Sequence, residues 1–576
     1  MKGKGSAVHQ VAIIGGGPSG LFMLKKLIDR GKQFSVHIFE KGKQLGAGMP
    51  YSPQGANEEH VTNVSGNEIP KLQQSITEWI SKVHPDTIAR FGIDLEYFHE
   101  YKVLPRLLFG QYLSDQFHLL QKRAIEVGIA LEVSYNAEVV DILDWSEVEQ
   151  VELELADGTK FRFESVVICT GHLWPKLHEG KIDGYFDSPY PPVKLRQTFN
   201  HPVAIRGASL TAIDALRTLA RQHGHYQRAA DGTLTYVLNK GNRDFRIVMH
   251  SREGLLPGIR FHLEEPILGK DSLFDREELQ KIRGENDGFV PLDLIFEEKF
   301  KRPLSETDPD FYQEVATMGV EEFIAKMMSL REGIDPFLLF RSEYREAARS
   351  IKQHRSVHWK EMLCGLSYTL NYPAKYFSAE DMLRLKQTLM PLISLIIAFV
   401  PQSSAEELLA LYDADILRLV AVGNSSEVKP LENGGVDYDI EDENGTAQSN
   451  HYRTFIDCIG QPHLSFEQIP YPGLRENGTI APARVSFRKQ EIARKMVDEN
   501  TDIELDANGN FYLKVPGLAI NDYFQVVDAY LALNPRLYVM AVPFIGGYNP
   551  DYSGLDFCET AATRIAGAID NQIITK

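Results

Sequence analysis

Cysteine is scarce in this chain of 576 residues, and no two cysteines lie close together in the sequence. The four residues are Cys169, Cys364, Cys458 and Cys558, and none belongs to a Cys-x-x-Cys pair. Zinc ribbons, thioredoxin-like motifs and disulfide frameworks all need clustered cysteines, so the spacing excludes these three classes. A dithiol relay of the disulfide-reductase type is disfavoured for the same reason.

The chain is also short of positive charge, with 61 Lys and Arg residues against 79 Asp and Glu residues and a net charge of −18. Nothing in this balance offsets repulsion from phosphate groups, so nucleic acid and anionic membrane surfaces are disfavoured as main partners. Glycine (44 residues) and proline (29 residues) occur at ordinary frequencies, which excludes collagen-like and disordered chains.

Long apolar runs are missing as well. The longest, residues 390–400, is too short to cross a bilayer as a helix. The apolar run 11–14 near the N-terminus is too short for the central region of a signal peptide. We therefore expect a soluble, cytoplasmic protein without a membrane partner.

The strongest local signal is a Gly-x-Gly-x-x-Gly motif at residues 15–20. The apolar run 11–14 precedes it, a pattern with an apolar helix face follows it, and a second apolar strand, 34–40, ends on Glu40. This order of strand, glycines, helix, strand and acid is the order that a dinucleotide-binding βαβ unit requires. An ordinary glycine-rich turn, the alternative, does not account for the flanking elements.

Each part of this motif has a physical role. Gly15 allows the tight turn, Gly17 lets the backbone approach a pyrophosphate, and Gly20 lets the helix pack closely on the strand. The helix N-terminus offers unpaired N–H groups and a positive dipole end to the phosphates. The carboxylate of Glu40 can accept hydrogen bonds from ribose hydroxyls.

A second unit of the same kind starts with the strand 202–206 and reads Gly207-x-Ser209-x-x-Ala212. Alanine is permitted at the third position of the motif. Serine at the second position is a departure, because its Cβ and hydroxyl lie where the pyrophosphate normally approaches the backbone. Binding at this second unit is expected to be weakened or shifted.

The next strand of the second unit, 246–250, ends in Ser251-Arg252 instead of an acid. An acid would favour the 2′-hydroxyl of NAD, whereas an arginine can pair with the 2′-phosphate of NADP. We therefore expect NADPH, with NADH less favoured. The alternative is that Arg252 pairs with a structural carboxylate, for which Glu253 is adjacent.

Several short motifs carry a resemblance to a known family. They are Gly-Pro-Ser-Gly at 17–20, Gly-Ala-Gly-Met-Pro-Tyr-Ser at 46–52, Thr-Asn-Val at 62–64, Pro-Arg-x-x-x-Gly-x-Tyr-Leu at 105–113 and Ser-Arg-x-Gly-Leu-Leu-Pro at 251–257. With them the chain resembles the two-dinucleotide-domain flavoproteins and, more closely, the FAD-NAD(P)-binding protein family. Met49-Pro50 and Ser65 depart slightly from that family's pattern.

The resemblance implies an α/β fold with two Rossmann-like domains, of which the FAD domain is discontinuous and the NADP domain is nested. The expected FAD domain covers 1–195 and 466–576, and the expected NAD(P) domain covers 196–260 and 441–465. Residues 261–440 are expected to form a mainly helical insertion. Within it, apolar spacing predicts helices over 276–282, 310–328, 342–354, 379–399 and 405–422.

This insertion is interpreted as a lid or substrate wall, or alternatively as a scaffold or oligomer surface. His354 and His358 could share a helix face within it, but no His-Glu-x-x-His motif or nearby acid completes a metal site, and none is expected.

In flavoproteins of this type, a strand ending in Thr-Gly passes the dinucleotide, and the C-terminal helix starts near the flavin pyrimidine. Residues 166–171 and the helix predicted from Gly554 to Ile569 match these elements. The cofactor contacts that the resemblance implies are Gly15, Gly17, Pro18, Ser19, Gly20, Glu40, Lys41, Tyr51, Asn63, Arg106, Thr170, Gly171, Gly207, Ser209, Leu210, Thr211, Arg252, Gly554 and Leu555.

The catalytic residues stay open at this stage. Tyr51, Asn63 and His172 are candidates, and a purely structural hydrogen bond is an equal alternative for His172. Arg106 is expected to pair with a phosphate or an acidic substrate.

The resemblance, together with the absence of a Cys-x-x-Cys pair, predicts an FAD-dependent monooxygenase. NADPH would reduce the flavin, and dioxygen would then form a C4a-(hydro)peroxyflavin that oxygenates a small molecule, with N-hydroxylation as one candidate reaction. Two alternatives remain open. One is an FAD oxidase or dehydrogenase with little use of NADPH, which the Ser209 departure favours. The other is a flavin-binding redox sensor without catalytic activity.

Overall fold

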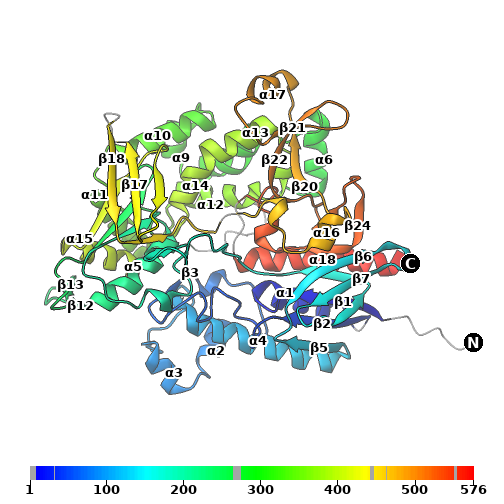
Figure 1. The fold of residues 1–576 in the computed structure, drawn as a ribbon, viewed down its shortest axis with the longest axis horizontal. Coiled ribbons are helices and arrows are strands. Elements are labelled where there is room, and N and C mark those ends of the chain that lie inside the picture. The colour runs from blue at the N-terminus through cyan, green and yellow to red at the C-terminus, as the bar shows by residue number, and fades with distance from the viewer. Residues whose placement is uncertain are drawn as a thin grey trace, which may run out of the picture.

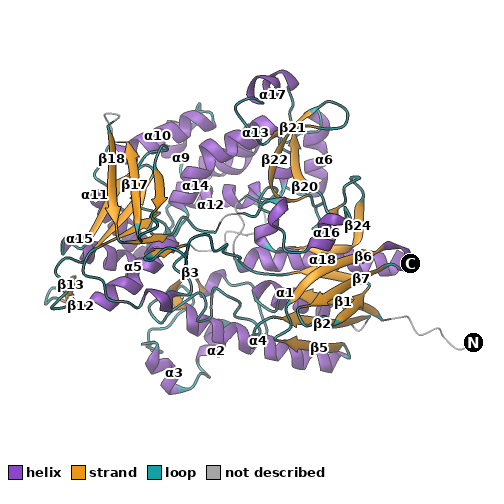
Figure 2. Cartoon of the chain, in the orientation of Figure 1, coloured by secondary structure: helices purple, strands orange, loops and turns teal. Residues whose placement is uncertain are grey.

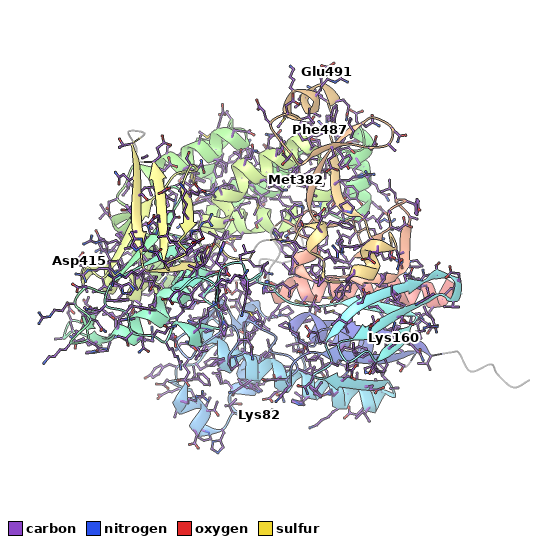
Figure 3. The ribbon with its side chains drawn as sticks, in the orientation of Figure 1. Lys82, Lys160, Met382, Asp415, Phe487 and Glu491 are labelled. Atoms are coloured by element: carbon purple, nitrogen blue, oxygen red, sulfur yellow. The ribbon has the colours of Figure 1, made fainter. Side chains whose placement is uncertain are left out.

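Two parallel β-sheets form the centres of two α/β units in the computed structural model of the chain (Figure 1). The structure describes residues 8–31, 33–263, 274–441, 446–461, 463–550 and 554–575. In the view of Figure 1 the first unit lies at the lower right, the second at the left, and a layer of helices lies above both. Lys160 of the first unit and Asp415 of the second lie on opposite sides of the molecule in this view (Figure 3).

The first sheet joins the two ends of the chain. Its strand order is β23-β24-β9-β1-β2-β5, and all neighbours except the edge strand β23 run parallel. The strands are β1 (His9–Ile14), β2 (Phe34–Glu40), β5 (Ala130–Tyr135), β9 (Ser165–Ile168), β23 (Gln525–Val527) and β24 (Leu533–Val539). The central strand β1 is apolar at consecutive positions because helices and the meander cover both of its faces.

Helices α1 (Pro18–Arg30) and α18 (Leu555–Thr575) lie side by side on this sheet (Figure 1). Arg30 donates to Asp570 at 3.0 Å, and Lys26 pairs with Glu559, so the C-terminal helix is fixed to the first helix of the chain. Helix α4 (Arg106–Val127) and the meander β6 (Val139–Trp145), β7 (Gln150–Leu155) and β8 (Lys160–Phe163) complete the unit. The predicted discontinuous α/β unit is confirmed.

The second sheet has the order β10-β19-β11-β14-β15, and its strands are all parallel. They are β10 (Tyr185–Phe186), β11 (Pro202–Arg206), β14 (Arg246–Ser251), β15 (Leu417–Ala421) and β19 (Thr454–Asp457). β10 and β15 both lie outside the ranges expected for this unit. The sheet is covered by α5 (Leu210–His223) and α15 (Gln402–Asp413), and the hairpin β12 (Gly224–Arg228) and β13 (Leu234–Leu238) packs beside α15.

The predicted helix over 405–422 is wrong in its second half. Helix α15 ends at Asp413, and β15 then pairs with β14 from Leu417 onward. A short apolar run can belong to a buried strand or to a helix, and periodicity alone does not separate them. The chain then forms a second meander, β16 (Glu427–Pro430), β17 (Val436–Glu441) and β18 (Ala447–Tyr452), which Figure 2 shows as strands at the left.

The middle layer is helical, as predicted. Its helices are α6 (Arg276–Glu285), α7 (Leu292–Phe296), α8 (Arg302–Thr307), α9 (Pro309–Val315), α10 (Val320–Glu332), α11 (Pro336–Gln353), α12 (His358–Leu370), α13 (Ala379–Arg384) and α14 (Met390–Ile396). The single helix expected over 310–328 is divided, because Gly319 has an extended backbone and serves as the N-cap of α10. A π-helical turn, 385–389, interrupts the helix expected over 379–399.

Two histidines in this layer do not share a helix face. His354 is the left-handed C-cap of α11, and His358 is the first residue of α12.

A small antiparallel sheet, which no sequence pattern predicted, lies beside the helical layer. Its strands are β20 (Pro482–Ser486), β22 (Phe511–Leu518) and β21 (Ile503–Leu505), and Met382 of α13 lies near it (Figure 3). Among the described residues, no helix is long and apolar enough to cross a membrane.

Candidate dinucleotide sites

The first glycine loop connects β1 to α1 at the carboxyl end of the first sheet. Gly15 has a φ of +102°, and its N–H donates to the Phe39 carbonyl at 2.8 Å. A Cβ at this position would lie 2.8 Å from the Cys169 carbonyl oxygen, and a Cβ on Gly20 would collide with the Gly15 carbonyl oxygen. The loop therefore needs glycine at both positions, on conformational and steric grounds.

The middle glycine of this loop faces the segment 45–50, which carries the family motif. A Cβ on Gly17 would lie 3.3 Å from the Cα of Gly48, and the Gly46 N–H donates to the Gly16 carbonyl at 2.7 Å. Gly17 is the N-cap of α1 and makes no side-chain cap, and Pro18 occupies the first turn of the helix. The first N–H groups of α1 are thus not satisfied by a capping side chain, as a pyrophosphate site requires.

Glu40 is held at the rim of the loop by backbone N–H groups. Its Oε2 accepts from Gly16 at 2.8 Å, and its Oε1 accepts from Gly42 at 2.6 Å. A carboxylate has about four lone-pair positions, so both oxygens keep capacity for a ribose hydroxyl. Lys41 follows as an exposed residue beside the carboxylate.

The N-terminus of α18 lies next to that of α1. Ser19 Oγ and Cys558 Sγ are 3.4 Å apart, and Gly554, with a φ of +111°, precedes the first residue of α18, Leu555. Two positive helix ends therefore meet at one edge of the first sheet. This geometry suits an anionic or electron-rich group placed between them.

Two buried polar atoms near the ends of β9 and β19 have no hydrogen-bond partner among the described residues: His172 Nδ1 and Gln461 Oε1. Thr170 lies at the same edge, and its hydroxyl interacts with that of Tyr471. A buried polar group without a partner costs about 1–3 kcal/mol, so such groups are rare unless a ligand completes them. Burial lowers the pKa of His172 to about 4, and His463 nearby contributes to this shift. The imidazole of His172 is therefore neutral at pH 7.

Tyr51 packs edge-on against Phe109, with ring centroids 4.9 Å apart. Burial raises the pKa of its hydroxyl to about 12, although Arg106 acts in the opposite direction, so the phenol keeps its proton at neutral pH. Asn63 belongs to β3 (Val61–Ser65), and its carbonyl accepts from Arg260 Nη1. The guanidinium of Arg260 also pairs with buried Glu68, an interaction that no sequence pattern indicated.

The side chain of Arg106 reaches the second unit. Its Nη1 donates to Asp214 Oδ2 at 2.5 Å, and its Nε donates to the Val61 carbonyl at 3.0 Å. The partner that the structure provides for Arg106 is thus a carboxylate of the protein itself. Asp214 lies on α5, the helix that follows the second glycine loop.

The second glycine loop repeats the backbone geometry of the first. Gly207 has a φ of +107°, its N–H donates to the His250 carbonyl at 2.7 Å, and a Cβ would lie 2.7 Å from the Cys458 carbonyl oxygen. Ser209 is the exposed N-cap of α5, and its hydroxyl makes no cap hydrogen bond. The first helical residues, Leu210 and Thr211, are half-buried, and their N–H groups have no capping side chain.

Arg252 lies just beyond the carboxyl end of β14. β14 pairs in parallel with β11, so Arg252 and the second glycine loop lie at the same edge of the sheet. The side chain is 61% exposed, and its ion pair with Glu253 is loose, with 3.8 Å between Nε and Oε1. Glu253, the alternative partner that the sequence offered for Arg252, therefore pairs with it only weakly.

Asp556, in the first turn of α18, is a partly buried acid that no sequence pattern indicated. Burial raises the pKa of Asp556 to about 8, with further contributions from Glu68 and Glu559. One turn later, Thr560 Oγ1 lies 3.4 Å from the hydroxyl of Tyr368 on α12, so the middle layer contacts the start of α18. The position of Asp556, two residues after Gly554, is the only sequence signal that could have marked it.

Two family models match parts of the chain. Residues 12–173 match the FAD-NAD(P)-binding family, and residues 275–397 match the YdhS-like middle domain. The first match confirms the expected resemblance and the expected cofactors of a two-dinucleotide flavoprotein. The second covers most of the helical layer.

Among known proteins, YdhS of Escherichia coli (strain K12), an uncharacterized protein, is 28% identical over 474 residues, which are 81% of this chain and 86% of YdhS. The reduced ornithine hydroxylase of Pseudomonas aeruginosa aligns with a TM-score of 0.49 and 12% identity over 99% of this chain and 100% of that chain. The bacillithiol disulfide reductase of Staphylococcus aureus aligns with a TM-score of 0.43 and 11% identity over 98% of both chains.

Proposed function

We propose that the chain is an FAD-dependent oxidoreductase that is reduced by NADPH and passes the electrons to dioxygen, as a monooxygenase of a small molecule. The observation that carries this proposal is the repetition of one loop geometry. Gly15 and Gly207 have similar positive φ values, +102° and +107°, and each lies close to the carbonyl that follows a return strand. Two such loops in one chain suit one dinucleotide each.

Dioxygen is proposed as the acceptor because the chain offers no dithiol relay. All four cysteines are free and buried, and burial raises the pKa of the Cys558 thiol, which lies beside Ser19 of the first loop, to about 12. A thiol that keeps its proton is a poor nucleophile and a poor electron carrier. The electrons from FAD then need a small diffusible acceptor.

FAD fits the first site. The pyrophosphate would lie at the start of α1, the ribose at Glu40, and the flavin near the start of α18, beside Thr170 and the unpartnered Nδ1 of His172. When bound, FAD supplies a ring that accepts hydride and reacts with dioxygen. The positive end of α18 stabilises negative charge on a neighbouring group, and neutral His172 and protonated Tyr51 orient groups without acting as bases at pH 7.

NADPH fits the second site through two side chains. Arg252 would pair with the 2′-phosphate, because its exposed guanidinium has only a loose partner. The exposed hydroxyl of Ser209 would donate to a pyrophosphate oxygen instead of capping α5. We assign β10 and β15 to this NADP-binding unit as well, since both belong to its sheet.

Anaerobic stopped-flow reduction tests the proposal. The purified yellow protein is mixed with NADPH or NADH, and the reduced protein is then mixed with oxygenated buffer, with and without candidate substrates. Fast bleaching by NADPH, a transient absorbance band before the oxidised spectrum returns, and an oxygenated product, with N-hydroxylated amines analysed first, would support it. Immediate formation of hydrogen peroxide without a transient would contradict the monooxygenase.

A second candidate function rests on Ser209, whose side chain occupies the place of the usual glycine. If that side chain blocks the pyrophosphate, the chain is an FAD oxidase or dehydrogenase that takes electrons directly from its substrate. The same instrument separates the two functions: reduction by NADPH would be slow, and reduction by an amine or a hydroxy acid would be fast.

A further inference from the structure

A buried ion pair connects the two α/β units. Asp214 of α5 accepts at Oδ2 from Arg106 Nη1 at 2.5 Å and from the Tyr190 hydroxyl at 2.7 Å. The side chain of Asp214 is 6% exposed and that of Arg106 is 15% exposed. Arg106 begins α4 in the first unit, and Tyr190 lies in the connection between β10 and β11 of the second sheet. We call Arg106, Asp214 and Tyr190 the interdomain clamp.

The segment 57–60 of the first unit supports the clamp. His60 Nε2 lies 3.1 Å from the Asp214 carbonyl and 3.2 Å from Thr218 Oγ1, while Glu59 accepts from the Thr218 hydroxyl at 2.7 Å. The backbone N–H of Arg106 donates to the His60 carbonyl at 2.9 Å. One face of α5 is therefore hydrogen-bonded to the first unit over about one turn, from Asp214 to Thr218.

A different residue of the same helix is fixed from another side. Arg217 donates through Nε and Nη2 to the two carboxylate oxygens of Glu407, each at 2.9 Å, and Arg221 reaches the same carboxylate at 2.7 Å. Glu407 lies on α15. Helix α5 is thus held by the first unit through Asp214 and Thr218 and by α15 through Arg217 and Arg221.

We infer that the interdomain clamp sets the distance between the two glycine loops, and that Arg106 is a positioning residue for hydride transfer. This inference rests on the proposed function, because it takes the second loop as the NADPH site. Asp214 lies four residues after Leu210, the first residue of α5, which is about 6 Å along the helix axis. A displacement of Asp214 therefore moves the second loop with it.

The charges of the clamp depend on each other. Burial acts against ionisation of Asp214, but Arg106 and His60 outweigh it, and the pKa of the carboxyl group is lowered. Removal of one partner leaves an uncompensated buried charge, which is more disruptive than removal of both. The relative orientation of the units should therefore respond to single substitutions more strongly than to the double substitution.

The first arm of the test measures hydride transfer. Arg106→Gln, Arg106→Lys and Asp214→Asn are compared with Arg90→Gln, which breaks an exposed ion pair with Glu58 at 2.7 Å. We expect Arg106→Gln to retain FAD while its flavin reduction rate at saturating NADPH falls about 10- to 100-fold, since a shift near 1 Å has effects of this size. Reduction of Arg106→Gln by dithionite and reduction of Arg90→Gln by NADPH should both stay within about 3-fold of the unmodified protein. Arg106→Lys keeps the charge beside Asp214 but not the fork of the guanidinium, so it should recover only part of the lost rate.

The second arm does not depend on NADPH. Spin labels at Glu126→Cys on α4 and Gln227→Cys on β12, both exposed, report the distance between the units, and the four native cysteines are buried. We expect one narrow distance distribution in the parent and a broader one in Arg106→Gln. The double variant Arg106→Met with Asp214→Leu should be intermediate, and it also serves if a single variant does not fold.

The outcomes separate the two proposals. If Arg106→Gln loses FAD while the label distance stays narrow, Arg106 is a cofactor ligand and the inference is overturned. An unchanged reduction rate in a folded, FAD-loaded Arg106→Gln protein would overturn it as well. If NADPH does not reduce the parent protein, the proposed function fails, and the label distances still decide whether the clamp fixes the units.

Discussion

The two glycine loops of this chain have the same backbone and different side chains. In both, the first glycine has a φ just above +100°, donates to the carbonyl at the end of the second strand, and lies under the carbonyl of a buried cysteine, Cys169 or Cys458. The turn is therefore a requirement of the βαβ fold. Selectivity has to come from the positions that differ.

Three differences between the two units bear on the ligand. Gly17 corresponds to Ser209, Gly20 corresponds to Ala212, and the acid Glu40 is replaced by a strand end that leads to Arg252. The first loop is bare backbone with a fixed carboxylate at its rim, which suits a ribose diol. The second loop adds a hydroxyl and an exposed guanidinium, which suits a more highly phosphorylated ligand.

Valine at the first glycine of each loop should have the largest effects on folding and on dinucleotide binding. Gly15→Val places its Cβ against the Cys169 carbonyl, and we expect loss of FAD and of most folded protein, measured by flavin absorbance and thermal unfolding. Gly207→Val makes the same collision with the Cys458 carbonyl, so we also expect less folded protein, but the molecules that fold should bind FAD and should not be reduced by NADPH. Gly128→Ala, with a φ of +80° and no atom within 4 Å of the added Cβ, controls for backbone strain alone, about 1–2 kcal/mol. Equal FAD loss in both valine variants would contradict separate sites.

Arg252→Ala should remove the preference of the second loop for NADPH. A charge-assisted contact contributes about 1.5–3 kcal/mol, so kcat/KM for NADPH is expected to fall about 10- to 100-fold while that for NADH changes little. The ratio of the two flavin reduction rates measures this effect. Arg243→Ala on the surface of the second unit is the control. A variant that keeps its NADPH preference would refute the role of Arg252.

The local parts of the two loops could be predicted from the sequence because strand, glycines and helix are contiguous. The partners of their side chains could not. The pairing of Arg106 with Asp214 joins residues 108 positions apart, and no sequence pattern marks it. The same holds for β15, which enters the second sheet after a helix-like run and takes its conformation from pairing with β14. Long-range pairing, not propensity, decided both cases.

Two buried histidines near the loops should make stability depend on pH in the same direction. Burial lowers the pKa values of His172 and His250 to about 4, below the ordinary value of 6.5. Between pH 6.5 and 4 the unfolded chain binds protons that the folded chain does not, so the free energy of unfolding falls with the pH. The contribution of each residue is complete above pH 6.5, and at pH 4 up to about 3 kcal/mol has been lost.

The difference between these histidines lies in their partners. His250 has its Nδ1 3.2 Å from the Ile205 carbonyl and its Nε2 3.2 Å from the Tyr452 hydroxyl, whereas His172 Nδ1 has no described partner. His172→Gln should therefore reduce the loss of melting temperature between pH 7 and pH 5 without lowering the stability at pH 7. His250→Gln should reduce this loss as well, but it should also lower the stability at pH 7. The exposed His84→Gln is the control. A large loss of stability of His172→Gln at pH 7 would show that His172 is a structural residue.

Ser209→Gly should have the smallest effect, a few-fold change in the KM for NADPH, but the direction of this change separates two roles of Ser209. The substitution gives the second loop the glycine that the first loop has at this position. Glycine at a helix N-cap costs only a few tenths of a kcal/mol relative to serine, so α5 and the fold should be unaffected. If Ser209 obstructs the pyrophosphate, the KM for NADPH falls about 2- to 5-fold on substitution; if its hydroxyl binds a pyrophosphate oxygen, the KM rises by a similar factor, since a neutral hydrogen bond contributes about 0.5–1.5 kcal/mol. The proposed NADPH-dependent function requires the rise. Ser209→Ala separates the hydroxyl from the Cβ, because it should raise the KM like Ser209→Gly when the hydroxyl binds, and leave it unchanged when the Cβ alone is the obstacle.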